Sequence, residues 1–563
     1  MTNEPVNDVP VLLHVIKERL GLMSALDKLV RRHGNRRGLS IGGVMGTWLA
    51  HILSECNHFM SHVESWAERL PESLGMLMEE PVNGGDLDDA RLSEVIRVLS
   101  DDGTWHALEH ETNQAMIRAY KLKVECVRLD TTTASVYSDK EGAVLFKRGY
   151  SKDHRPDLRQ LKVMVAGLDP LGVIVGADVV SGDQADDKLY VPMIERMRKS
   201  LGERGILYVG DSKMSALKTR SHIQATGNTY LMPLARIGEV PEQLSGWIEA
   251  GLQGRAKLVK LLSEEEPDKE IGRGYELKRK VVCDKDSWTE RVLIVQSEGF
   301  AEAARKGLRE RIARASKALE TLTPPPAKGK HQFSDRQKLL AAAQAIVKKH
   351  DVEAYLSWEI EMKNINPKKI RAYGNQPARV EYERWLVLRV LTDKTAIERD
   401  ERYLGWRAYV TNAPTHTLDL QRAVLTYRDE WLIERDLGRL KGRVLSLAPL
   451  WLKREDHALG MTRLLTLAVR ILALVEHEAR LKIKTDGQAV SGLFLSRKNR
   501  VTELPTTERM LGALDFIVLT TMRIGETVQR FITTLTETQQ RVIYLAGCPP
   551  DLYQRLTRNL AFG

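Results

Sequence analysis

The stretch VRLDTTTASVYS, residues Val127–Ser138, marks a change in the character of the chain and sets the expected fold. Its apolar and β-branched residues predict a buried strand, yet Asp130 interrupts the run and three threonines follow it. A carboxylate is costly to bury without a partner. We therefore expect Asp130 near the end of a first strand, with a chemical reason for its position.

The segments that follow predict an α/β arrangement. LKVMVAGLD and VIVGADVVS are two more short strands separated by turns, and the helix DKLYVPMIERMRKSLG leads to a further strand, GILYVGD. This is three strands in hairpin order, followed by a helical crossover to a parallel strand. The last strand ends at Asp211, where open α/β sheets place ligands. Two such aspartates on neighbouring strands could hold a divalent metal, although each alone is equally typical of a turn or a helix cap.

Composition limits the class of protein. The 563 residues are too many for one core, and the formal net charge of +10 favours a polyanionic partner such as nucleic acid over a neutral fold with a basic surface. The four cysteines form no Cys-x-x-Cys pair, which fits a reducing cytosol and argues against a zinc knuckle. The N-terminus lacks a signal pattern, and Arg463 and Arg470 interrupt the most apolar late run, so we expect no membrane span.

A late segment, LTYRDEWLIERDLGRLKGR, Leu425–Arg443, predicts one amphipathic helix. One face of that helix would carry Tyr427, Trp431, Glu434, Gly438 and Lys441. A carboxylate on such a face is costly to bury without a partner or a metal. For this segment in isolation, a solvated helix with surface salt bridges is the slightly simpler explanation.

The order of these features resembles the DDE transposases of bacterial insertion sequences, in the branch with a Tyr-Arg-Glu-Lys signature and a β-rich insertion before the glutamate. Four further stretches are similar to the same group: GYSKDHRPDLRQLKV, VVSGDQADDKLYVP, VGDSKMSALKTR and LPTTERMLGALDFIVL. The resemblance spans nearly the whole chain, and its specificity comes from the combined order of the motifs.

The resemblance implies an α/β fold with an RNase H-like catalytic core, interrupted by a mainly β insertion and flanked by helical N-terminal and C-terminal regions. The expected division is a helical domain for DNA-end binding (1–118), the first part of the core (119–240), a β-rich insertion with a helical arm (241–420), the second part of the core (421–480), and a helical C-terminal region that is a candidate for dimerisation (481–563).

The resemblance also implies the chemistry. Asp130, Asp211 and Glu434 would hold two Mg²⁺ ions, for which Mn²⁺ can substitute, and catalyse hydrolysis at the element end and joining of the 3′-hydroxyl to target DNA. The candidate DNA contacts are Tyr427, Arg428, Arg435, Lys441, Lys152, His154, Arg155 and Lys213. The implied partners are double-stranded DNA, both element ends and target, and a second copy of the chain in a homodimer. The implied location is the bacterial cytoplasm, at the nucleoid.

One position departs from the signature, because Glu430 stands where an arginine is due. We expect Glu430 to turn outward and pair with Arg428 or Lys441, since a carboxylate aimed at phosphate would oppose DNA binding. Arg428 or Arg435 would then make the missing phosphate contact. Two alternatives remain open: a catalytically silent, transposase-derived DNA-binding protein, and a metal-dependent nuclease that joins no strands.

Overall fold

The computed structural model describes residues 1–30, 38–138, 141–202, 204–325, 327, 329–330, 332–374, 376–494, 500–525 and 527–558. It is a mixed α/β structure organised around a sheet of nine strands in the order β4-β3-β2-β5-β6-β12-β9-β8-β7. The α/β prediction is therefore confirmed.

The first half of the sheet follows the predicted order. Its elements are β2 (Cys126–Val136), β3 (Arg159–Leu168), β4 (Val173–Ser181), α8 (Asp187–Leu201), β5 (Leu207–Gly210), α9 (Leu217–Ala225) and β6 (Thr229–Pro233). The strands β2, β3 and β4 pair antiparallel, as in successive hairpins, and β5 then pairs parallel to β2 after the helix α8. The predicted hairpin order and helical crossover are confirmed.

The second half of the sheet comes from the region expected to be a β-rich insertion. Its elements are α10 (Val240–Leu252), β7 (Val259–Leu262), β8 (Glu270–Cys283), β9 (Asp286–Ser297) and β12 (Trp406–Thr411). Strand β12 pairs with both β6 and β9, so these strands extend the same sheet. The insertion contains strands, as expected, and backbone pairing joins them to the first half of the same sheet.

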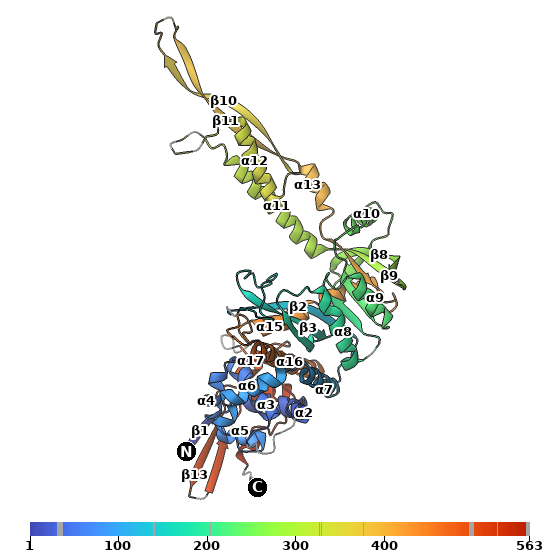
Figure 1. Ribbon diagram of the computed structural model, residues 1–563, viewed down its shortest axis with the longest axis vertical. Coiled ribbons are helices and arrows are strands. Elements are labelled where there is room, and N and C mark those ends of the chain that lie inside the picture. The colour runs from blue at the N-terminus through green and yellow to red at the C-terminus, as the bar shows by residue number, and fades with distance from the viewer. Residues whose placement is uncertain are drawn as a thin grey trace.

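A long arm leaves this sheet between β9 and β12 (Figure 1). Its elements are α11 (Glu298–Glu320), α12 (Arg336–His350), β10 (Leu356–Ile370), β11 (Arg379–Thr392) and α13 (Lys394–Glu401). The arm has its own hydrophobic core, in which Leu308 and Leu319 of α11 meet Leu339 of α12 and Leu386 and Leu388 of β11. The arm is thus a separately packed unit, and its tip lies at the opposite end of the molecule from both termini (Figure 1).

The N-terminal region is mainly helical, as predicted. Its elements are β1 (Thr2–Pro5), α1 (Val9–His14), the π-helical turn η1 (Val15–Arg19), α2 (Leu22–Leu29), α3 (Ile41–Glu55), η2 (Met60–His62), α4 (Val63–Ala67), α5 (Pro71–Met78), η3 (Gly84–Leu87), α6 (Asp89–Ser100) and α7 (Asp102–Tyr120). The side chain of Ser40 caps α3 by accepting a hydrogen bond from the backbone N–H of Gly43, as its position before the apolar run suggests.

The last part of the chain, from Leu420 onward, departs from the expected helices within its C-terminal region. Its elements are α14 (Leu420–Arg428), α15 (Trp431–Lys441), α16 (Glu455–Asp486), α17 (Thr507–Gly512), β13 (Val518–Ile524), β14 (Thr527–Ile532), α18 (Glu537–Leu545) and η4 (Gln554–Thr557). Strands β13 and β14 form a hairpin, and β1 adds to it as a third strand. Pairing between the two ends of the chain therefore stabilises strands in a region that the local sequence pattern predicted to be helical.

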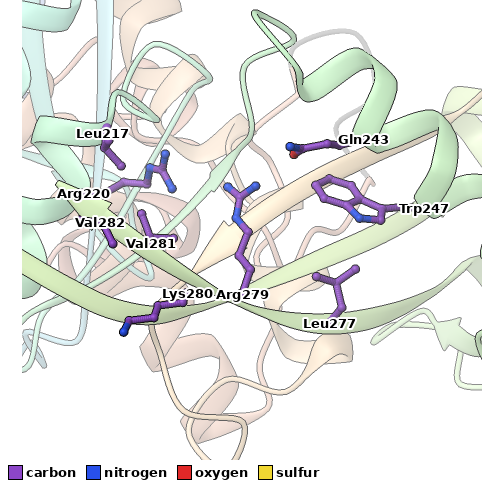
Figure 2. A pocket seen from close by; sticks show the side chains of 9 residues that line it. All are labelled: Leu217, Arg220, Gln243, Trp247, Leu277, Arg279, Lys280, Val281 and Val282. Carbon is purple, nitrogen blue, oxygen red and sulfur yellow. The ribbon is translucent and has the colours of Figure 1, made fainter.

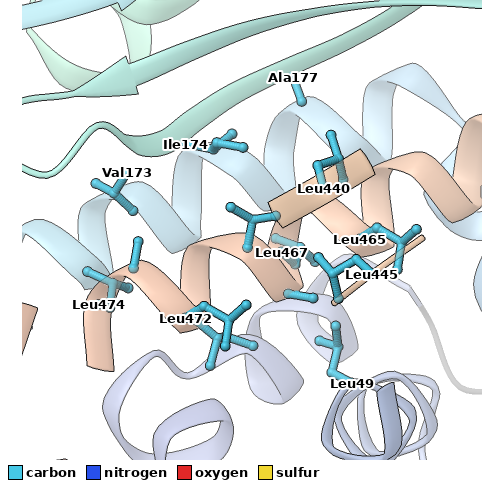
Figure 3. Close-up of a cluster of buried hydrophobic side chains, with 14 of the residues drawn as sticks. Leu49, Val173, Ile174, Ala177, Leu440, Leu445, Leu465, Leu467, Leu472 and Leu474 are labelled. Carbon is cyan, nitrogen blue, oxygen red and sulfur yellow. The ribbon is translucent and has the colours of Figure 1, made fainter. Parts of the chain in front are cut away.

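Helix α16 is the central packing element. Leu465, Leu467 and Leu472 of α16 pack among residues of β4 and of the N-terminal helices, in one continuous hydrophobic cluster (Figure 3). Arg463 and Arg470 are buried without interrupting the helix, because Leu99 and Ile174 supply backbone carbonyl acceptors. By length and hydropathy α16 could cross a membrane, and 94% of its apolar window is buried inside the structure. The described part of residues 1–120 thus shares one core with the sheet.

Candidate active site

Strand register brings Asp130 and Asp211 side by side. Leu129 of β2 is the register partner of Gly210, the last residue of β5. Asp130 and Asp211 each follow directly in the chain, so they are neighbours too. Asp211 follows the end of β5 as predicted. Asp130 does not lie near a strand end, because β2 continues to Val136 through pairing with β3. The shorter neighbour β5 leaves this edge of β2 open beside Asp130, where a ligand can approach.

Asp130 is a half-buried carboxylate with one nearby cation. Its Oδ1 accepts a hydrogen bond from the backbone N–H of Thr131 at 2.7 Å and lies 3.6 Å from Nζ of Lys152. Burial raises the pKa of Asp130, Lys152 opposes that rise, and the negative charge of Asp211 adds to it. A second cation would therefore stabilise the ionised form.

Asp211 is oriented by two donors. Its Oδ1 accepts from the hydroxyl of Tyr190 at 2.7 Å and from the backbone N–H of Lys213 at 2.8 Å. Burial raises the pKa of Tyr190, and the adjacent Asp211 raises it further, so this hydroxyl stays protonated and keeps donating. The side chain of Lys213 is exposed, in reach of a ligand at the sheet edge.

The helix expected across 425–443 is two helices. Tyr427 belongs to α14, which ends at Arg428, and Glu434 belongs to α15, which begins at Trp431. The chain turns at Asp429 and Glu430, where acidic side chains are favoured ahead of the first turn of α15. The predicted common face is therefore wrong for Tyr427. Within α15, Trp431, Glu434 and Gly438 share an exposed face, and Lys441 is half-buried on it.

Glu430 lies on the side opposite to the one expected. It is half-buried and accepts a hydrogen bond from the hydroxyl of Tyr427. Burial raises its pKa, and the charges of Asp130, Glu434 and Asp211 raise it further. The expected ion pair with Arg428 or Lys441 is not formed among the described residues: Glu430 instead binds Tyr427 and lines the same cavity as Glu434. The structure thus groups four acidic side chains, which we call the acidic cluster: Asp130, Asp211, Glu430 and Glu434.

Two predicted lysines lie beside this cluster, held by the threonines of β2. Nζ of Lys441 forms an ion pair with Asp153 and donates to Oγ1 of Thr132 at 3.2 Å. Nζ of Lys152 donates to the carbonyl and, at 3.0 Å, to Oγ1 of Thr131. The threonines after Asp130 therefore fix cations at the edge of the cluster. Asp153 is a residue whose part in the site no local pattern indicated.

Arg435 is not available for a phosphate contact. Its guanidinium donates to Glu476 of α16 at 2.8 Å and to the carbonyl of Leu171 at 3.2 Å. Arg439 joins the same buried network, through Asp436, Glu476 and Glu508. The prediction for Arg435 is wrong because this side of α15 packs against α16. The network instead attaches to the protein core the helix that carries Glu434.

The remaining predicted contacts lie at the surface. Arg428 and His154 are exposed, and His154 has a left-handed backbone conformation with φ of 56°. Arg155 is exposed too, and it pairs with Asp157 at 2.7 Å and donates to the hydroxyl of Tyr137 at 3.2 Å. Arg428 and His154 are therefore accessible to a ligand, whereas Asp157 partly neutralises the charge of Arg155.

A cavity of about 260 Å³ adjoins the acidic cluster. Glu430 and Glu434 line one part of it, and Arg407 and Arg428 line another. Arg407 projects from β12, with its guanidinium 4.2 Å from the ring centre of Phe300. Arg407, which was not among the predicted site residues, brings a cation into the cavity that Glu430 lines.

A second hollow, of about 570 Å³, lies between α9, α10 and β8 (Figure 2). Its two arginines are satisfied internally, because Arg220 and Arg279 both bind Glu290, at 2.6 Å in each case. The hydroxyl of Tyr230 also donates to Glu290, at 2.6 Å. The two arginines of this hollow therefore belong to an ion network that attaches α9 to the extended sheet, and they are not left over for a ligand.

The chemistry of the acidic cluster fits a hard divalent cation, since its donors are carboxylate oxygens without nitrogen or sulfur. Within the described residues, no three His, Cys, Asp or Glu side chains stand close enough to share one ion. Asp130 and Asp211 are adjacent by register, so these two carboxylates are the pair placed to share an ion.

Comparison with known proteins identifies the family to which most of this chain is similar. Residues 125–469 match the family described as "Transposase DDE domain", a range that begins just before β2 and ends within α16. No curated protein matches the chain. One similar solved structure is described as a cryo-EM structure of a piggyBac transposase synaptic complex with hairpin DNA. Its TM-score is 0.33 and its identity 9%, over 90% of this chain and 78% of that one.

Proposed function

The chain belongs to the transposase DDE-domain family, and from that premise we propose that it cuts and joins DNA at the acidic cluster. The observation that carries the proposal is the register of β2 and β5, which sets Asp130 beside Asp211, together with the packing of α15, the helix that bears Glu434, against β2. Lys152 and Lys441 flank these carboxylates, as a phosphate-binding site requires.

The proposed core is RNase H-like, with Asp130, Asp211 and Glu434 as the residues that hold divalent metal. When bound, Mg²⁺ or Mn²⁺ supplies Lewis-acid activation of the attacking hydroxyl and neutralises charge on the phosphate. Tyr190 holds Asp211 in one orientation, and Thr131 and Thr132 hold the two lysines toward the DNA backbone. The same arrangement serves both in-line steps, first with water and then with the freed 3′-hydroxyl as nucleophile.

The wider assignments are proposals of the same kind. The substrates are the ends of an insertion sequence and a target duplex, the active assembly is a homodimer, and the location is the bacterial cytoplasm at the nucleoid. The proposed role of residues 1–118 is DNA-end recognition. Because β1 pairs with β13 and α6 packs on α16, surface substitutions test that role better than deletion, which would expose the core.

A joining assay separates the proposal from its two alternatives. The substrate is a labelled duplex that carries the inverted repeat flanking the coding region, incubated with the full chain, Mg²⁺ and a supercoiled plasmid. A transposase yields labelled ends covalently joined to the plasmid. Cleavage without joined product would indicate a nuclease, and binding without cleavage would indicate a silent DNA-binding protein.

Arg407 is expected to replace the signature arginine as a phosphate contact. Arg407→Gln should slow DNA cleavage by about 10- to 100-fold, the equivalent of one lost charged hydrogen bond of about 1.5 to 3 kcal/mol. The check is the single-turnover cleavage rate at saturating Mg²⁺. Arg422→Gln, an exposed arginine on α14, is the matched control and should cleave at the wild-type rate. Equal rates for both variants would remove Arg407 from the site.

A further inference from the structure

The outer half of the β10–β11 ribbon lies beyond the core of the arm. Leu356, Leu386 and Leu388 at its base pack against α11 and α12. Farther out, the described side chains from Glu361 to Tyr382 are exposed or half-buried, and none is buried. Figure 1 shows the ribbon continuing past the two helices. A two-stranded ribbon without a packed face is marginally stable in water, so contact with a partner would stabilise this part of the arm.

The charge of this segment indicates the chemistry of that partner. From Glu361 to Tyr382 the ribbon has five basic residues and two acidic ones, Glu361 and Glu381, which gives the segment a net charge of +3. Arg379 pairs with Glu381 at 2.8 Å. Lys363, Lys368, Lys369 and Arg371 make no ion pair within the described part of the chain, although Lys368 is the register partner of Glu381. Four cations on an unsupported ribbon are suited to a dense array of negative charges.

The narrow shape of the ribbon favours duplex DNA among the possible polyanions. The major groove of duplex DNA is about 12 Å wide and admits a two-stranded β-ribbon. At the ribbon's end Tyr373, 90% exposed, precedes Gly374, whose φ is +59°. A narrow basic ribbon ending in an exposed aromatic ring fits a groove between two phosphate backbones better than it fits a flat protein surface.

The arm also fixes where such a contact would fall. Helix α11 begins one residue after Ser297, which lines the cavity next to Glu434, and its 23 residues extend about 35 Å at 1.5 Å per residue. One turn of DNA spans about 34 to 36 Å. The ribbon tip thus stands more than one helical turn of DNA away from the acidic cluster.

We propose that the outer β10–β11 ribbon is a second DNA-binding element, which enters the major groove of the duplex more than one turn from the cut site. The inference rests on the proposed function for the identity of the polyanion. Its contacts are with phosphates, through Lys368, Lys369 and Arg371, and they add affinity for any duplex long enough to reach them.

The test measures binding of the full chain to random-sequence duplexes as a function of salt. Lys368, Lys369 and Arg371 are replaced together by alanine, and Lys338, Lys348 and Lys349 of α12 are replaced together as the matched control. On a long duplex, the plot of log affinity against log salt should lose about 0.9 in slope per lost phosphate contact, or roughly 2 to 3 for the ribbon variant. On a duplex of about one turn, the ribbon variant and the wild type should bind equally.

A shortened ribbon gives an independent variant. Met362 and Leu386 are register partners, so an Asn-Gly turn joining them removes only the unsupported segment and should reproduce the loss. Wild-type slopes in both ribbon variants, or an equal loss in the α12 control, would overturn the proposal. Loss of self-association in sedimentation, with DNA binding unchanged, would overturn it in favour of contact between copies. If the wild type bound no duplex at all, the proposed function would fail as well.

Discussion

Asp130→Asn and Asp211→Asn are each expected to abolish metal-dependent DNA cleavage while leaving DNA binding intact. Asparagine preserves the shape of the side chain and removes the charge that would hold a divalent ion between β2 and β5. Loss of this contribution, about 4 kcal/mol or more, corresponds to roughly a thousandfold lower rate. The measurement is the cleavage rate across a Mg²⁺ titration, with DNA affinity determined in parallel.

The control for these two variants is Asp183→Asn, an exposed aspartate just after β4. It should cleave like the wild type. Cleavage at the wild-type rate by Asp211→Asn would exclude the acidic cluster as the catalytic site. Loss of DNA binding together with cleavage would indicate that the aspartates stabilise the fold.

Arg439→Met is expected to produce the largest loss of stability among single substitutions in α15. Asp436 and Glu476 are almost fully buried, and Arg439 binds both of them as well as Glu508. Removing one partner of a buried ion pair leaves an uncompensated charge and costs roughly 3 to 5 kcal/mol. Arg435, which also contacts both acids, places the expected loss at the lower end of that range.

The check is the urea midpoint of unfolding, followed by tryptophan fluorescence. Arg443→Met, at an exposed position just after α15, is the matched control and should unfold like the wild type. A midpoint for Arg439→Met equal to that of the control would show that the network contributes no stability. The same variant should lose cleavage activity in proportion to its unfolded fraction, since the network holds the helix that bears Glu434.

The sequence allowed the central sheet to be predicted because its signals are local. Each strand from β2 to β5 is an apolar run bounded by turns, and chain order alone favours hairpins before a helical crossover. The placement of Asp130 beside Asp211 follows from the same pattern. The extent of β2 beyond Asp130 was missed, because pairing with β3 lengthens a strand irrespective of where its apolar run ends.

The errors arose where distant residues decide the structure. β13 pairs with β1, although more than 500 residues separate the partners, so no local window indicates that sheet. Arg435 appeared to be a surface cation because its partner Glu476 lies on another helix. The turn at Asp429 and Glu430 divides a continuous helical pattern, and it changes the direction of Glu430. No local pattern marks Arg407 as a site residue, because it reaches the cavity only through the place of β12 between β6 and β9 in the sheet.

The most direct test of the account is cleavage of an end-labelled duplex that carries the inverted repeat next to the coding region, measured with Mg²⁺ and with EDTA. We expect a nick at the boundary of the repeat that leaves a 3′-hydroxyl. The nick should form only with the divalent ion, and it should be absent with Asp130→Asn. Cleavage that persists in EDTA, or in Asp130→Asn, would contradict catalysis by metal held at the acidic cluster.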